Sequence, residues 1–228
     1  TGKSMDGKLI VFEGVEGSGK TTQIQKCQEW LQNSDRLSGT SVVVTREPGG
    51  TELGVGLRRL LLEGHRDLIC DRAELLLYAC DRSQHVEEVL KPQLAKGAII
   101  LCDRYTDSTV AYQAYGRGLS LSLINQLNQL ATDNLESDLT LWLDIEVEIG
   151  LERARQRGTV DRMEQADLAF HRRVQQGYQE LAAAYPQRIV RVDASRSQDE
   201  VEAQIQEILL EKLRVGRRGE GIDLMLTP

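Results

Sequence analysis

A glycine-rich segment between a strand and a helix constrains this 228-residue chain more than any other feature. Residues 14–21 read GVEGSGKT and fit the pattern G-x-x-x-x-G-K-[ST]. The apolar sequence LIVF leads into the segment, and the helical sequence TTQIQKCQEWL follows it. Backbone N–H groups in such a P-loop surround a phosphate, and the helix N-terminus adds a favourable dipole. The chain is therefore expected to bind ATP or a similar nucleotide.

The residues of the P-loop have separate expected tasks. Lys20 is expected to reach the β- and γ-phosphates, and the Thr21 hydroxyl is expected to bind Mg²⁺. The full set expected to hold ATP is Gly14, Val15, Glu16, Gly17, Ser18, Gly19, Lys20, Thr21 and Thr22. Glu16 is unusual in this set, because a carboxylate inside an anion-binding loop costs free energy unless it faces something other than phosphate.

A carboxylate at the end of another strand is a second candidate metal ligand. In the sequence AIILCDRY, an apolar strand ends in Asp103, on the edge of the sheet where phosphates would lie. An aspartate after a strand often only caps a helix. The P-loop earlier in the chain favours the Mg²⁺ role.

Five short apolar segments are predicted to be strands: residues 9–12, 41–45, 98–102, 139–143 and 189–192. Segments with helical periodicity lie between and after them: residues 21–31, 72–90, 121–131, 147–157, 167–185 and 197–213. This alternation predicts one α/β domain with a parallel sheet covered on both faces. Ligands of such sheets bind at the carboxyl ends of the strands. Residues 214–228 lose the periodicity and are expected to form a tail.

Composition excludes several classes of partner. The formal net charge of −7 argues against a protein that coats nucleic acid. The longest apolar segment, residues 98–102, is too short to span a bilayer, and the polar start of the sequence predicts no signal peptide. The four cysteines, Cys27, Cys70, Cys80 and Cys102, have no C-x-x-C spacing and fit reduced thiols in the cytoplasm.

Three further segments indicate a phosphorylated acceptor. Arg46 in TREPGGT follows the second strand and is placed to bind a phosphate. Tyr78 and Arg82 in LLLYACDR are four residues apart on one helical face, a possible platform for a base, although a lone tyrosine is more often half-buried core. The third segment, DRYTDSTVAYQ, supplies Arg104 to bridge two phosphates and a helical stripe that faces a base and sugar: Thr109, Tyr112 and Gln113.

A P-loop alone does not separate GTPases, ATPase motors and small-molecule kinases. The N-K-x-D motif that reads guanine in GTPases is absent, and a motor is normally larger or repeated. The candidate acceptor residues therefore favour a kinase.

Five motifs in this order resemble the thymidylate kinase family: FEGVEGSGKTTQ, TREPGGT, LLLYACDR, DRYTDSTVAYQ and RARQRGTVDRME, covering residue 8 to about 195. The resemblance implies the fold of a P-loop nucleoside-monophosphate kinase, with a five-stranded parallel sheet and a small lid. It implies transfer of the γ-phosphate of ATP to dTMP, giving dTDP for dTTP synthesis, with Mg²⁺. Members of the family are homodimers.

The resemblance also implies roles for individual residues. Glu16 would accept a hydrogen bond from the 3′-hydroxyl of dTMP and so face away from ATP. Arg46 and Arg104 would hold the acceptor phosphate, Tyr78 would stack on thymine, and Arg82 would contact its O4 atom. Three more residues match positions near the nucleoside: Thr109 and Gln113 near the base, and Tyr112 against the 2′ position.

No basic residue lies between Val15 and Ser18, so the transferring phosphoryl group must draw positive charge from elsewhere. The sequence LERARQRGTVDRME resembles the arginine-rich lid of the bacterial type and offers Arg153, Arg155, Arg157 and Arg162. Arg153 and Arg157 are the favoured candidates, which makes the predicted catalytic set Lys20, Arg104, Arg153 and Arg157. The lid is expected at about residues 153–165 of one kinase domain, residues 8–213, after an extension, residues 1–7.

Rival functions remain open at this point, and within enzymes the closest is a kinase for another nucleotide or for a deoxynucleoside. A nucleoside kinase would need a carboxylate base, for which Glu13 or Glu16 could serve, but a neutral nucleoside gives Arg46 and Arg104 no anion to bind. An inactive nucleotide sensor is the rival from another class. The three histidines show no partner pattern in the sequence, so none is assigned a catalytic role: His65, His85 and His171.

Overall fold

The computed structural model describes residues 7–34, 37, 39–63, 69–156, 158 and 161–215. Within them, five strands form one parallel sheet in the order β2-β3-β1-β4-β5. Their bounds are β1 Lys8–Glu13, β2 Val42–Arg46, β3 Ile99–Asp103, β4 Leu139–Asp144 and β5 Ile189–Asp193. Each predicted strand is confirmed to within one residue at either end. The parallel five-stranded architecture is confirmed as well.

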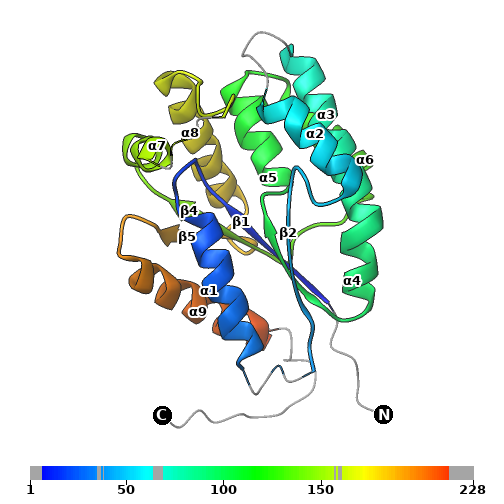
Figure 1. Cartoon of the computed structure of the whole chain (residues 1–228), viewed down its shortest axis with the longest axis vertical. Coiled ribbons are helices and arrows are strands. Elements are labelled where there is room, and N and C mark those ends of the chain that lie inside the picture. The colour runs from blue at the N-terminus through cyan, green and yellow to red at the C-terminus, as the bar shows by residue number, and fades with distance from the viewer. Residues whose placement is uncertain are drawn as a thin grey trace.

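Helices pack against the sheet from both sides (Figure 1). Their bounds are α1 Lys20–Gln32, α2 Glu52–Leu62, α3 Asp71–His85, α4 Lys91–Ala95, α5 Thr106–Thr109, α6 Leu121–Thr132, α7 Val147–Gln156, α8 Leu168–Ala184 and α9 Gln198–Val215, with π-helical segments η2 Val86–Leu90 and η3 Val110–Gly116. Helices α1 and α9 lie side by side, and α8 packs on η3 and β5. Helix α3 lies between α2 and α6, contacting both.

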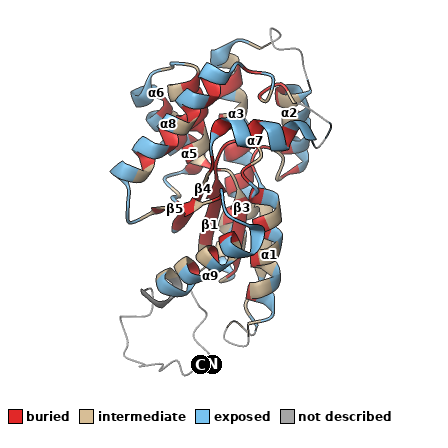
Figure 2. Cartoon of the chain, turned by 90° about the vertical axis from the view of Figure 1, so that its left-hand side faces the viewer, coloured by how far each residue is buried: buried red, intermediate tan, exposed pale blue. Residues whose placement is uncertain are grey.

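The sheet lies at the centre of the core, and the inward faces of the helices complete it. Strand β1 illustrates this, since Leu9, Val11 and Phe12 are fully buried and side chains on both faces of the strand meet helices. Figure 2 shows the buried residues concentrated in the strands and on the inward faces of the helices. Among the described residues, no helix combines the length and apolar character needed to cross a membrane.

Helix α2 is an element that the sequence prediction did not include. Its sequence ELGVGLRRLLL contains Gly54 and Gly56, and glycine lowers helix propensity by roughly 1 kcal/mol relative to alanine. The helix forms because the Thr51 side chain accepts a hydrogen bond from the Gly54 amide at 2.9 Å and because Leu57 and Leu61 are buried. Tertiary packing thus outweighs the local propensity.

The two ends of the predicted domain fall largely outside the described residues. Helix α9 continues through Val215, two residues beyond the predicted end of the last helix. Residues 216–228, most of the predicted tail, and residues 1–6 of the predicted extension lie outside the described part of the chain.

The P-loop packs directly on the first turn of α7. Gly17 has φ +71°, and a Cβ atom there would lie 1.9 Å from the carbonyl oxygen of Gly150. A Cβ atom on Gly150 would in turn lie 2.5 Å from the carbonyl oxygen of Glu16. Only glycine fits at these two positions, so the helix that carries Arg153 begins in contact with the loop.

Candidate active site

A cavity of about 640 Å³ lies where β1, β2 and β3 end. The P-loop lines one part of it, and α3 and η3 line another. It joins the predicted donor and acceptor sites, because its lining includes Lys20, Thr21, Asp103, Arg46, Tyr78, Arg82, Arg104, Thr109, Tyr112, Gln113 and Arg153. The carboxyl edge of the sheet therefore brings together segments that lie more than 100 residues apart in the chain, as the parallel topology predicts.

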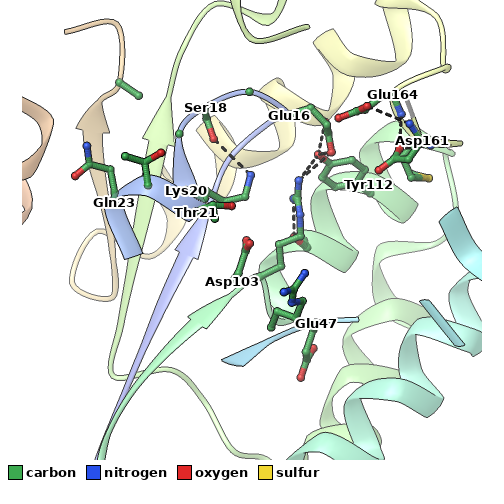
Figure 3. Close-up of a pocket in the computed structure, with 18 of the residues that line it drawn as sticks. Glu16, Ser18, Lys20, Thr21, Gln23, Glu47, Asp103, Tyr112, Asp161 and Glu164 are labelled. Atoms are coloured by element: carbon green, nitrogen blue, oxygen red, sulfur yellow. Dashed lines mark hydrogen bonds and ion pairs between the residues drawn. The ribbon is translucent and has the colours of Figure 1, made fainter. Parts of the chain in front are cut away.

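The Lys20 side chain hydrogen-bonds to the P-loop residues that precede it. Its ammonium donates to the carbonyl oxygens of Gly14 at 3.0 Å and Val15 at 3.2 Å, and to the Ser18 hydroxyl at 3.4 Å. Gly14 and Gly19 both have positive φ, which turns the loop ahead of α1. The loop thus has the shape that surrounds a phosphate, with Lys20 at its centre (Figure 3).

The surroundings of Asp103 show whether the residues of the cavity fit a magnesium ion. It lies at the end of β3 and lines the cavity together with Lys20 and Thr21 (Figure 3). Its Oδ1 atom is buried and has no hydrogen-bond partner among the described residues, which leaves an oxygen ligand available. Magnesium prefers oxygen ligands and is often held by one or two protein groups together with substrate phosphates and water. The residues therefore fit Mg²⁺ held beside a nucleotide.

Glu16 points away from the phosphate-binding side of the loop. Its carboxylate accepts hydrogen bonds from Arg104 Nη2 at 2.9 Å and from the Tyr112 hydroxyl at 2.7 Å and 2.8 Å. Burial alone would raise the pKa of this carboxyl, but Arg104, Lys20 and Tyr112 lower it below its usual value. The carboxylate is therefore ionised and turned toward the acceptor half of the cavity, as Figure 3 shows for Glu16 and Tyr112.

Arg104 links the two halves of the cavity. Besides Glu16, its guanidinium donates to the hydroxyls of Tyr112 at 3.1 Å and Ser108 at 3.1 Å. Its backbone has φ +70°, a left-handed conformation that is uncommon for a residue with a side chain. The Arg104 amide donates to Phe12 O at 3.0 Å, which fixes this turn directly after β3. The strained backbone aims the side chain across the cavity.

Glu13, a candidate base for a nucleoside kinase, is fully buried, and both of its carboxylate oxygens accept hydrogen bonds from the protein. Its two oxygens accept hydrogen bonds from the backbone amides of Tyr105 and Ser108 and from the hydroxyls of Ser108 and Tyr178, at 2.6–3.1 Å. Burial raises the pKa of its carboxyl despite the nearby Arg104. Glu13 does not line the cavity, so it holds the segment after β3 in place and is not positioned to act as a base on a ligand there.

The predicted acceptor residues Arg46 and Tyr78 both line the cavity. Arg46 ends β2 beside Asp103 in the sheet register and is exposed. It makes no hydrogen bond or ion pair with another residue in the described part of the chain, so its five donors are available to an anion. Tyr78 is half-buried, which leaves part of its ring facing the cavity.

Most of the N–H donors of Arg82 bind other residues of the protein. Its Nε atom donates to Glu47, Nη1 donates to Thr109 and Asn128, and Nη2 donates to Tyr105 O, all at 2.7–2.9 Å. A guanidinium has five N–H groups, so these bonds leave one N–H of Nη2. The remaining N–H can donate one hydrogen bond to an oxygen atom of a base.

The predicted helical stripe lines the cavity with Thr109, Tyr112 and Gln113. Each of these side chains also forms a hydrogen bond with another residue of the protein. The Thr109 hydroxyl accepts from Arg82, Tyr112 donates to Glu16, and the Gln113 amide donates to Glu74 at 2.8 Å. These bonds fix the orientation of each side chain before any ligand binds.

The predicted lid arginines separate into different environments. Arg153 is exposed in the last turn of α7 and lines the cavity, whereas Arg155 is exposed and does not line it. Arg162 is buried, donates to Leu61 O at 2.7 Å and pairs with Glu74. Arg162 therefore anchors the segment after α7 instead of facing phosphate. Arg157 lies outside the described residues.

Sequence analysis missed several residues of the cavity. The start of α9 and the turn before it line the end of the cavity beside Thr22 and Gln23, through Arg196, Ser197, Gln198 and Val201. Arg58, Asp161 and Glu164 line it elsewhere. Asp161 and Glu164 belong to the arginine-rich motif but were not singled out there, and only the fold brings the residues at the start of α9 to the P-loop.

Two histidines have partners that their sequence context does not reveal. His85 Nδ1 lies 2.8 Å from Glu47 Oε1, and its Nε2 lies 2.7 Å from the Thr45 hydroxyl. His171 Nδ1 lies 3.7 Å from Glu16 Oε2. His85 buttresses the loop after β2, and His171 borders Glu16 from α8. Neither lines the cavity.

Lys20 gives the site an expected pH dependence. Burial and the nearby Arg104 lower the pKa of its ammonium to about 8, against the opposing effect of Asp103. Above this pH the free enzyme loses the charge that would bind phosphate. The kcat/KM for ATP reports the free enzyme and is expected to fall about tenfold between pH 7 and pH 9. In the Lys20→Arg variant, which stays charged, the residual kcat/KM should lose this decline; an equal decline would contradict the assignment.

The fold and the cavity together define a P-loop kinase for a small phosphorylated acceptor. A phosphate-binding loop meets a second set of arginines in one cavity, on a parallel sheet of order 2-3-1-4-5.

Comparison with known proteins specifies the family. The thymidylate kinase family model matches residues 12–205. The thymidylate kinase of Nostoc punctiforme is 68% identical over 207 residues, covering 90% of this chain and 96% of its own length. That of Trichormus variabilis is 60% identical, covering 92% and 99%. The crystal structure of thymidylate kinase from Ehrlichia chaffeensis superimposes with a TM-score of 0.74 at 32% identity, covering 89% and 98%. The chain belongs to the thymidylate kinase family.

Proposed function

We propose that this chain transfers the γ-phosphate of ATP to dTMP, giving ADP and dTDP for dTTP synthesis. The observation that carries the proposal is the orientation of Glu16. A carboxylate inside the P-loop is turned toward Arg104 and Tyr112, so the loop presents its amides and Lys20 to one ligand and an acidic side chain to another. Arg46 and Arg104 supply the positive charge that a monophosphate acceptor needs.

The reaction needs little covalent help from the protein. An oxygen of the dTMP phosphate forms a bond to the γ-phosphorus while the bond to the β,γ-bridging oxygen breaks, and ADP leaves with that electron pair. The acceptor phosphate is ionised at neutral pH, so no general base is required. Lys20 and Arg104 hold the two phosphates in line and neutralise their charge, which supplies most of the catalysis.

Mg²⁺ would be held by Thr21 and Asp103 beside the ATP phosphates, where it would neutralise charge on the β- and γ-oxygens. The free Oδ1 atom of Asp103 supports this placement.

Arg153 and the segment that follows it would act as a lid, at about residues 153–165 of a kinase domain spanning residues 8–213. Arg153 lines the cavity, and so do Asp161, Met163 and Glu164 from the segment that follows. Closure would bring Arg153 toward the transferring phosphoryl group and exclude water, which protects ATP from hydrolysis.

Turnover of six acceptors tests the activity. ADP release from ATP and Mg²⁺ is measured with dTMP, dUMP, dCMP, dGMP, AMP or thymidine offered separately. Strong turnover is expected with dTMP, with dUMP poorer by ~10–200-fold because a single methyl group distinguishes them. Thymidine should give none, because it brings no phosphate to Arg46 and Arg104. Preference for thymidine would show that these arginines do not bind an acceptor phosphate, and silence with all six would favour a nucleotide sensor.

Two copies of the chain would form a homodimer through α2, α3 and α6. These neighbouring helices expose large apolar side chains, of which Leu130 is 78% exposed: Leu53, Leu60, Leu76, Leu123 and Leu130. Leu76→Glu combined with Leu130→Glu is expected to halve the mass measured by light scattering at micromolar concentration. Leu210→Glu on α9 is the matched control and should leave the mass unchanged. A wild-type mass equal to one chain would contradict the proposal.

The reaction would take place in the cytoplasm. The four cysteines are unpaired, as expected for a reducing compartment.

A further inference from the structure

Helix α3 carries three functional side chains in line. Glu74, Tyr78 and Arg82 are spaced four residues apart and share one helical face. Tyr78 and Arg82 line the cavity, whereas Glu74 is 1% exposed and does not. A buried carboxylate at the end of a base-binding face requires an explanation, because burying a charge costs free energy unless it is paired.

Glu74 is held by three partners from two other parts of the chain. Gln113 Nε2 donates to its Oε1 at 2.8 Å, Arg117 donates to both oxygens at 3.1–3.2 Å, and Arg162 Nη2 donates to Oε2. Burial would raise the pKa of Glu74, but Arg117, Gln113 and Arg162 lower it. The group is therefore a carboxylate, which accepts hydrogen bonds and donates none.

The carboxylate fixes which end of the Gln113 amide faces a ligand. Since Glu74 only accepts, the NH₂ group of Gln113 must face it, and the carbonyl oxygen lies at the other end of the amide. Gln113 lines the cavity, and its carbonyl oxygen makes no hydrogen bond with any residue that the structure describes. Gln113 therefore offers the cavity an acceptor, and Arg82 offers its one remaining N–H as a donor.

We propose that Glu74 is a positioning residue that sets base specificity by locking the Gln113 amide with its carbonyl oxygen toward the base. The inference rests on the proposed function, in which the base is thymine. Thymine presents an N3–H donor beside its O4 acceptor and matches this pair. Cytosine presents an N3 acceptor beside an amino donor, so acceptor would face acceptor and donor would face donor.

Glu74→Gln tests the proposal, because a glutamine of almost the same shape can donate to Gln113 and let its amide turn over. The dissociation constants of dTMP and dCMP are measured by calorimetry for the wild type and each variant. The wild type should bind dTMP more tightly, and the ratio of the two constants should shrink about tenfold or more in Glu74→Gln, as expected for one reversed hydrogen bond.

Arg162→Met is the matched control. It breaks the same buried ion pair but leaves the bond between Glu74 and Gln113, so both variants should melt at lower temperature while only Glu74→Gln loses discrimination. In a Gln113→Leu background, Glu74→Gln should change the ratio no further, because the amide through which it acts is gone.

An unchanged ratio in folded Glu74→Gln, or an equal loss in Arg162→Met, would overturn the proposal. So would a wild type that binds dCMP as tightly as dTMP. A wild type that discriminates in binding but fails to phosphorylate dTMP would instead overturn the proposed function and leave the role of Glu74 intact.

Discussion

Replacing Arg104 by alanine is expected to lower kcat/KM for dTMP about 10³-fold, within the range by which a single phosphate-stabilising arginine accelerates such reactions. Arg104 is a charged residue that contacts the P-loop carboxylate and also lies in the acceptor half of the cavity. Its loss removes positive charge from beside the acceptor phosphate and leaves Glu16 ionised with one charged neighbour fewer. The expected result is a higher KM for dTMP together with a lower kcat, measured by ADP release.

Arg104→Lys should recover only a small part of this loss, since an ammonium does not reproduce the fork of a guanidinium. Arg172→Ala is the matched control, because Arg172 is exposed on α8, pairs with Glu148 at the surface and does not line the cavity. Its kinetics should equal those of the wild type. An Arg104→Ala enzyme that keeps its kcat/KM within tenfold of the wild type would show that the acceptor phosphate is held elsewhere.

Replacing Lys20 by alanine is expected to reduce kcat by about 10²–10³, the usual effect of removing a donor aimed at developing charge. The ammonium bonds to Gly14 O, Val15 O and Ser18 Oγ and forms no ion pair with a carboxylate in the described part of the chain, so it is held at the loop centre. Binding of ATP should weaken as well, because the β- and γ-phosphates lose their nearest positive charge. Single-turnover rates and ATP affinity separate the two effects.

Lys26→Ala serves as the control on the same helix. Lys26 pairs with Asp199 and Glu202 on α9 and does not line the cavity, so its loss should leave kcat unchanged. If Lys20→Ala and Lys26→Ala had equal kcat values, the loop would bind the donor through its amides alone.

Local pattern sufficed to predict the strands, the P-loop and the placement of Tyr78 and Arg82 on one helical face toward the cavity. Each depends on residues within a few positions of one another, where the period of a strand or helix is visible. The role of Glu16 required the family resemblance, and the structure agrees with its direction: the carboxylate faces Arg104 and Tyr112. Its contact with a 3′-hydroxyl stays a prediction.

Residues that meet only in the folded chain were not predictable in this way. Arg162 stood among the candidates for phosphate contact, yet it pairs with Glu74, 88 positions away, because the segment after α7 folds back onto α3. Glu74 itself carried one signal, its spacing of four from Tyr78. The residues at the start of α9 carried none, since parallel topology alone places Ser197 and Gln198 beside the P-loop.

The close approach of Gly17 and Gly150 restricts how this sequence can drift over evolution. A side chain at either position would collide with the backbone of the other segment. Every single substitution of Gly17 or Gly150 is therefore expected to be harmful. Gly56 on α2 has open space around it and is free to vary. In a library of random variants, we expect positions 17 and 150 to stay invariant even where the surrounding surface diverges. A lineage that lost one of them would have to rebuild the start of α7, and with it the placement of Arg153, in the same step.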